Sequence, residues 1–372
     1  MESMEKRPFG LQLGPTLFSL VSILIILAGS YLVWAVFGDP HLAVWKLYPQ
    51  PFGVVLFWSI LFTVYFGFMG QLWGLSHLKQ PLQGLVWVLL TTVLAVVAVV
   101  ALLHGYGSLD PAFDIAKGGY TATAMIVLIG FYTWGILGTG MAHWPWVDLG
   151  LKQPWVGIAE FFVGFFLTFL GYVVLIYPSL ASWASPERTV LPLTTVIGWF
   201  YCVIVSWLTT FLIFENWPWT TFGSRGKAAM ASLVGNFILG TAFYFVFLYL
   251  LKGFLVPQEA QAKLGDAINL WPAQLGVCVS FWLIAWANVA GNVPTHLGSF
   301  ANKVIRFIIT YGLAFVTFVV YTRWFAIGVL HEAEISPGFG GDPLTWVDLM
   351  IYVMLIYVIY FGSYGLTKRA HN

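Results

Sequence analysis

Apolar residues occur in ten long runs along the chain, and the short stretches between the runs hold most of the polar residues. Each run has about 20 residues or more, the length that an α-helix needs to cross a hydrocarbon core of about 30 Å. The pattern therefore predicts an all-α polytopic membrane protein, with residues 1–372 forming a single transmembrane domain of about ten helices. The runs cover residues 15–38, 51–74, 82–104, 120–142, 155–178, 190–214, 228–253, 270–291, 304–329 and 346–366.

Composition supports the same class and excludes others. Of the 372 residues, 60% are hydrophobic and only 8% are charged, whereas soluble domains carry about 25% charged residues. The 16 Lys and Arg nearly balance the 15 Asp and Glu, so there is no basic field to attract nucleic acid. The two cysteines, Cys202 and Cys278, lie inside apolar runs and offer no disulfide framework. The expected surroundings are a lipid bilayer.

The connections between the runs carry charge asymmetrically. If both termini and the loops after the second, fourth, sixth and eighth runs share one side, ten of the 16 Lys and Arg lie there. The positive-inside rule then places that side, with both termini, in the cytoplasm, as for a protein of the cell (inner) membrane. Ten of the 15 Asp and Glu fall on the opposite side, and Asp348 is counted among these loop carboxylates.

Three of the cytoplasmic connections have similar sequences. Each contains a His or Asn, one spacer residue and a Pro, as in His143-Trp-Pro145, Asn216-Trp-Pro218 and Asn292-Val-Pro294. A helix ends readily at Asn or His, Pro prevents its continuation, and the Gly that follows permits a chain reversal. The motif is typical of interfacial turns. The alternative is that His143, Asn216 and Asn292 surround a vestibule and contact a substrate, and a third interpretation is chance similarity among Trp-rich loops.

The spacing of these turns predicts tandem two-helix repeats inserted in the same sense. The three motif prolines are 73 and 76 residues apart, and a degenerate earlier copy ends at Pro81, 73 residues before Pro154. Residues 51–329 would then form four helical hairpins, flanked by helices 15–38 and 346–366. Same-sense repeats are related by an axis along the membrane normal, as in some transporters.

Three polar side chains fall inside predicted membrane helices, where an ionisable group costs about 2.5–3.5 kcal/mol. Glu160, Asn236 and Arg306 lie 15, 18 and 12 residues after the motif prolines. Because steps of three residues keep side chains on neighbouring helix faces, we expect all three to face one interior path. Glu160 would bind a proton and Arg306 would pair with it. Alternatively, Arg306 extends to the interface, and Asn236 makes only a structural interhelical hydrogen bond.

Two further asparagines belong to the same set of candidates. Asn288 and Asn292 are four residues apart in the eighth run and are expected to share one helix face. Together with Glu215 they would line the cytoplasmic half of the path. The alternative is that both asparagines only cap helices and bridge them.

Signals for cofactor chemistry are weak. The seven histidines do not fall at matching depths in facing runs, so they form no set of haem or metal ligands. The sequence also contains no ATP-binding loop, no CxxC motif and no dinucleotide fingerprint. No metal site is therefore predicted.

The sequence favours a membrane transporter or channel for a small solute, proton-coupled through an intramembrane carboxylate. The alternative is an integral membrane subunit of an enzyme or redox complex that handles a quinone or apolar substrate. That alternative is based on an aromatic content of 18%, including 19 Trp, which would suit an apolar ligand pocket. A purely structural membrane protein is the third class. A homo-oligomer and partner membrane subunits are both compatible with the sequence.

Overall fold

The computed structural model describes residues 10–180 and 189–368, which are almost entirely helical. Ten helices in these ranges are long and apolar enough to cross a membrane, one for each predicted run. The prediction of an all-α polytopic membrane protein is therefore confirmed. The eighth span begins earlier than predicted, at Gln258, because α9 (Gln258–Leu264) and the 3₁₀ turn Gly265–Leu270 lead directly into α10 (Trp271–Ala285).

Five of the ten helices form a closed inner ring. Around the ring, α2 contacts α4, α4 contacts α7, α7 contacts α10, α10 contacts α13, and α13 contacts α2. At least 56% of the most apolar stretch of each inner span is buried, so these helices face protein on most sides. They are α2 (Phe52–Val64), α4 (Gly119–Gly138), α7 (Leu193–Leu208), α10 (Trp271–Ala285) and α13 (Pro343–Leu355).

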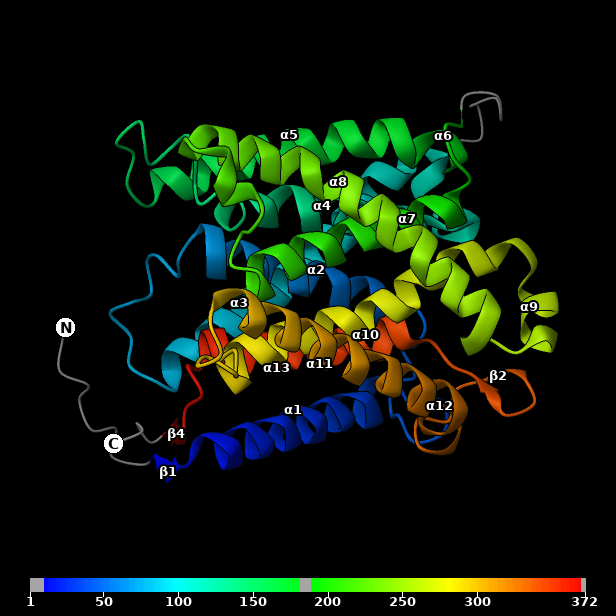
Figure 1. Cartoon of the computed structure of the whole chain (residues 1–372). Coiled ribbons are helices and arrows are strands. Elements are labelled where there is room, and N and C mark those ends of the chain that lie inside the picture. The colour runs from blue at the N-terminus through cyan, green and yellow to red at the C-terminus, as the bar shows by residue number, and fades with distance from the viewer. Residues whose placement is uncertain (1–9, 181–188, 369–372) are drawn as a thin grey trace.

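The other five long helices lie outside this ring. Each has its most extensive contact with one inner helix: α3 with α2, α5 with α4, α8 with α7, α11 with α10, and α1 with α13. At most 33% of each outer span is buried, which leaves an apolar surface suited to lipid. Figure 1 shows α5 and α1 on opposite sides of the bundle, with inner helices between them. The outer helices are α1 (Pro15–Phe37), α3 (Leu82–Val100), α5 (Trp155–Leu175), α8 (Arg225–Leu250) and α11 (Ser299–Val320).

All five inner helices run in the same direction. At their starts, Gln274 of α10 donates a hydrogen bond to Asp342, which precedes α13. Near their ends, Trp207 of α7 donates to Thr139, which follows α4. We call the two ends of the ring its amino end and its carboxyl end accordingly. In Figure 1 the amino end carries α9 and β2, and the carboxyl end carries β1 and β4.

The turns at the carboxyl end share an unusual backbone conformation. In five of them, two successive residues have φ between 49° and 74°, in the left-handed region that few L-residues adopt. His143, Asn216 and Asn292 each take the second of these positions, and His and Asn are among the residues that tolerate it best. The five pairs are Gln71 and Leu72, Ala142 and His143, Glu215 and Asn216, Gly291 and Asn292, and Gly362 and Ser363.

Close packing between the inner and outer helices depends on small residues. A Cβ atom at Gly164 of α5 would overlap the indole ring of Trp134 on α4, and one at Gly240 of α8 would meet the backbone of Val203 on α7. Small residues of this kind let helix backbones approach closely in membranes. The outer helices are thereby held against the ring along a single face.

Short elements complete the fold. The parallel pair β1–β4 joins the chain ends, with Leu11 opposite Leu366, and β2 pairs antiparallel with β3 at the amino end. Several long helices finish in a π-helical turn, four of them on the inner ring: Tyr65–Met69, Thr209–Ile213, Trp286–Ala290 and Ile356–Tyr360. The remaining elements are α6 (Tyr177–Leu180), α12 (Ala326–Gly328), β1 (Leu11–Leu13), β2 (Glu334–Ser336), β3 (Phe339–Gly340) and β4 (Leu366–Lys368).

Candidate functional site

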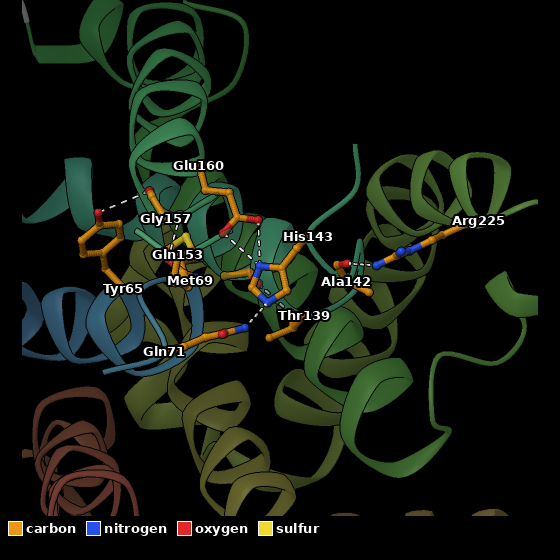
Figure 2. Close-up of polar contacts among 11 residues, drawn as sticks. Tyr65, Met69, Gln71, Thr139, Ala142, His143, Gln153, Gly157, Glu160 and Arg225 are labelled. Atoms are coloured by element: carbon orange, nitrogen blue, oxygen red, sulfur yellow. Dashed lines mark hydrogen bonds and ion pairs between the residues drawn. The ribbon is translucent and has the colours of Figure 1, made fainter. Parts of the chain in front are cut away.

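Glu160 lies in α5, fully buried, and faces the carboxyl-end turn that holds His143. Nδ1 of His143 is 3.0 Å from Oε1 and 3.2 Å from Oε2 of Glu160. The other ring nitrogen of His143 is 3.2 Å from Nε2 of Gln71, in the turn after α2. Figure 2 shows the imidazole between the carboxylate and the amide. The histidine side chain is 16% exposed and that of Glu160 is fully buried. The imidazole ring therefore lies between the buried carboxylate and the protein surface.

Neighbouring hydrogen bonds fix the start of α5 against the end of α2. The side chain of Gln153 donates to the carbonyl oxygen of Met69, and the Tyr65 hydroxyl donates to that of Gly157. These contacts hold Glu160 in register with the turns. The geometry gives Glu160 a structural partner in His143.

Arg306 does not pair with Glu160, contrary to expectation. Its Nη1 is 3.1 Å from Oε1 of Glu215, and its Nε and Nη2 donate to the carbonyl oxygen of Pro294. The reason is the ring geometry: α5 packs on α4 whereas α11 packs on α10, and α7 separates those two inner helices. The guanidinium is buried by protein and is directed toward the carboxyl-end turns, where Glu215 and Pro294 lie.

Asn236 is buried between α7 and α8, and all of its polar atoms have partners. Its amide nitrogen donates to the carbonyl oxygen of Ser232 at 2.7 Å, and its amide oxygen accepts from the hydroxyls of Ser206 and Thr210. This is the pattern of an interhelical hydrogen-bond network.

The two asparagines near the end of α10 do not share a helix face. The helix ends at Ala290 because Gly291 is left-handed, so Asn292 lies in the turn while Asn288 remains on the helix. Asn288 is exposed and donates to its own helix at the Ile284 carbonyl. Asn292 donates to the Leu212 carbonyl at 3.0 Å and thus joins α10 to the end of α7.

The predicted residues therefore do not converge on one path. Glu160, Asn236 and Arg306 are all buried toward the inner ring, but each is engaged in a different hairpin. Asn216 lies in the turn after α7, partly buried, as the second of the two left-handed residues there. These side chains form a set of separate contacts around the carboxyl end.

A cavity lies instead inside the inner ring. All five inner helices line it, and the volume open to the centres of water molecules is about 60 Å³. One buried water needs about 10–15 Å³ of such volume, so there is room for about four to six. Three of the lining residues are polar, Tyr201, Ser280 and Asp348. The others are Phe57, Ala124, Met125, Val127, Leu128, Phe131, Ile197, Ile204, Leu208, Ile284, Leu344 and Ile351.

Asp348 is the only carboxylate among the described lining residues of this cavity. It is buried, and its closest side-chain contact is the Tyr201 hydroxyl, 3.4 Å from Oδ1. No ion pair involves Asp348 within residues 10–180 and 189–368. Asp348 was expected among the carboxylates of the loops, and the structure places it inside the membrane span, in the second turn of α13, which begins at Pro343.

Further acidic residues gather at the amino end, outside the membrane spans. Glu332 accepts from the Tyr321 hydroxyl and from the backbone N–H of Asp342, both at 2.5 Å. Burial raises the pKa of Glu332 to about 7, against the effect of the Tyr321 hydrogen bond, and the nearby charge of Asp342 acts in the same direction as burial.

Asp39 is the second acidic residue in this region, and its carboxylate is 2.9 Å from Nδ1 of His331. Burial acts to raise the pKa of Asp39, but hydrogen bonds from the N–H groups of Leu42 and His41 and from His331 outweigh it and hold the pKa below its usual value. Among the described residues, no group of three or more His, Cys, Asp or Glu side chains is placed to hold a metal ion.

Comparison with known proteins adds no assignment. No family model matches the chain, and neither a curated protein nor a solved structure is similar to it at a significant level. The sequence reasoning missed Tyr201, Ser280 and Asp348. The available signal was that Asp348 falls within the last apolar run, 346–366, where a carboxylate is as costly as at Glu160.

Proposed function

We propose that the protein is a transporter for a small solute, with a path along the axis of the inner ring and a coupling proton carried by Asp348. The observation that supports this most strongly is the cavity to which all five inner helices contribute and in which Asp348 is the sole described carboxylate. Ionisable residues at membrane depth that face a cavity typically mark ion and substrate paths. Glu160 then serves to hold the carboxyl-end turns, which close one end of the path.

The orientation proposed from the loop charges assigns the carboxyl end to the cytoplasm, in the cell (inner) membrane. Under this assignment Asp348, in the second turn of α13, lies in the half of the ring that faces the opposite side of the membrane. The carboxyl-end turns would then form the cytoplasmic gate. Cysteines introduced singly at Gln71 and Glu334 and labelled with an impermeant maleimide test this orientation.

The structure suggests a fifth helical hairpin in addition to the four proposed from the sequence. The left-handed pair Gly362 and Ser363 follows α13 just as Ala142 and His143 follow α4, and α1 packs on α13 as α5 packs on α4. We therefore propose five hairpins in place of four flanked by single helices, with the last hairpin assembled from the two ends of the chain.

A flux assay tests the proposed function. The purified protein is reconstituted in liposomes that contain a pH-sensitive dye, and inward gradients of small ammonium, carboxylate and neutral solutes are imposed one at a time. One solute class is expected to change the internal pH in a protein-dependent manner. Asp348→Asn should abolish this change, while Glu259→Gln, at an exposed position on α9, should leave it intact. No protein-dependent flux with any class would contradict transport.

The apolar lining favours a second candidate function, a membrane subunit that binds an apolar molecule for a larger enzyme. Twelve of the 15 lining residues are apolar. Under this alternative, partner chains or a bound chromophore should copurify from gently solubilised membranes, and Asp348→Asn should leave solute flux unaffected.

A further inference from the structure

We propose that the cavity binds a small organic cation, an ammonium group on a short apolar chain, and that Asp348 holds either this cation or a proton. The inference rests on the proposed function and specifies its substrate class. Its basis is that the carboxylate of Asp348 lies in a mostly apolar cavity and has no basic partner among the described residues.

Among the residues that the structure describes, no positively charged side chain pairs with Asp348. The titratable groups that face it are Tyr201 from α7, Cys278 from α10 and Asp342 at the start of α13, and none of these is a cation at neutral pH. The Tyr201 hydroxyl at 3.4 Å is a long contact. An ionised carboxylate at this depth lacks a counter-charge and is costly. A cationic ligand or a bound proton removes that cost.

The rest of the cavity selects the kind of cation. The side chains of Phe57, Phe131, Ile204 and Ile351 line the walls. Besides the Asp348 carboxylate, the described lining offers only two side-chain oxygens, the Tyr201 and Ser280 hydroxyls, fewer than the roughly six to eight ligands that a metal ion such as Ca²⁺ takes. An alkylammonium ion places its apolar chain against such walls and its single charge at the carboxylate. Aromatic rings add a favourable interaction with an ammonium group. The available volume suits a chain of about three to six non-hydrogen atoms.

Sharing one carboxylate couples the two ions. When the ammonium group binds, the proton leaves the Asp348 carboxyl for solvent, and when the ammonium leaves, a proton returns to the same oxygen. No other reactant takes part and charge is conserved in the cavity. Because the cation and the proton exclude each other, the transporter exchanges one for the other across the membrane.

Calorimetric titration of the purified full-length protein in detergent tests this inference. The probes are n-butylammonium chloride, 1-butanol and sodium butyrate, which share a chain length and differ in charge. Butylammonium is expected to bind at least tenfold more tightly than the other two and to release a proton, detected from heats in buffers of different ionisation enthalpy. Asp348→Asn should weaken butylammonium binding at least tenfold, Asp348→Glu should largely retain it, and Glu259→Gln should not change it.

Two results would overturn the inference: 1-butanol binding as tightly as butylammonium, or folded Asp348→Asn protein binding butylammonium with unchanged affinity. Should Asp348→Asn not fold, Ile351→Trp narrows the cavity without removing the carboxylate, and unchanged affinity in that variant would also overturn it. The two proposals fail separately. If Asp348 is required for flux of another solute and butylammonium does not bind, only the proposal of an organic cation as substrate is contradicted. If butylammonium binds and no solute is transported, only the proposal of transport is contradicted.

Discussion

Gln71 and His143 approach each other through two nitrogen atoms, Nε2 of the amide and Nε2 of the imidazole, at 3.2 Å. An amide nitrogen can only donate, so this ring nitrogen accepts and the proton of a neutral imidazole lies on Nδ1. Nδ1 faces Glu160. The pair is thus a hydrogen bond between Nδ1 of His143 and the buried Glu160 side chain, and the orientation of the ring is set by a residue from the preceding hairpin.

Removal of His143 should destabilise the protein markedly. His143→Ala removes the hydrogen bond to Glu160 and leaves a buried carboxyl oxygen without its partner, which costs about 1–3 kcal/mol. Glu160→Gln should cost less, about 1 kcal/mol, because the amide can still hydrogen bond to the ring. Thermal unfolding of the detergent-solubilised variants measures both. Equal losses in the two variants would contradict the assignment of the histidine as the hydrogen-bond partner of Glu160.

Arg306 and Glu215 should contribute unequally although they form one ion pair. Arg306→Gln removes two hydrogen bonds to the Pro294 carbonyl as well as the ion pair, and its site is buried, so a loss of about 2–3 kcal/mol is expected. Glu215 has a side chain that is 56% exposed, and Glu215→Gln should cost less than about 1 kcal/mol. The comparison is of unfolding midpoints, and a larger effect at Glu215 would speak against this geometry.

Glycine substitutions on the outer helices should separate close packing from helix propensity. Gly164→Ala places a methyl group against the Trp134 ring and should destabilise by about 1–3 kcal/mol. Gly312→Ala on α11 is the matched control, because nothing lies within 4 Å of its added Cβ. There the better helix propensity of Ala should leave stability unchanged or raise it by up to about 1 kcal/mol. Measured unfolding temperatures that shift equally in both variants would contradict the contact.

Glu332 should make stability depend on pH. Its pKa is about 7 in the folded protein against a usual value of 4.5, so between these values the unfolded chain is ionised while the folded one keeps its proton. This contribution is fully present below pH 4.5 and is lost as the pH rises through 7, a total of about 3 kcal/mol. Unfolding followed from pH 5 to 8 measures the slope.

The control for this prediction lies on the same loop. Glu332→Gln should flatten the slope, whereas Glu334→Gln, at an exposed position, should leave it as in the wild type. A wild-type slope retained in Glu332→Gln would assign the pH dependence to another group.

The sequence was sufficient for the class of fold because the bilayer imposes a length and an apolar composition on each helix. It did not separate inner from outer helices, since both kinds are apolar throughout and differ only in which neighbours cover them. Glu160, Asn236 and Arg306 were recognisable as buried because polar residues in such runs are rare. Their partners were not recognisable: His143 and Glu215 lie in turns, and the left-handed backbone that aims them is a three-dimensional feature.

Asp348 was misplaced for a related physical reason. It lies near the start of its run, where sequence alone does not distinguish a headgroup carboxylate from one enclosed by four neighbouring helices. Only closure of the ring, which brings Tyr201 beside it, defines the cavity.

The parallel pairing of Leu11–Leu13 with Leu366–Lys368 means that the backbone is almost a closed loop. The folded bundle is therefore compatible with a chain that begins at a different hairpin. A rearranged gene in which a short linker connects Lys368 to Leu11, with a new break between residues 222 and 223 in the exposed turn before α8, should yield a product that assembles the same bundle starting from α8.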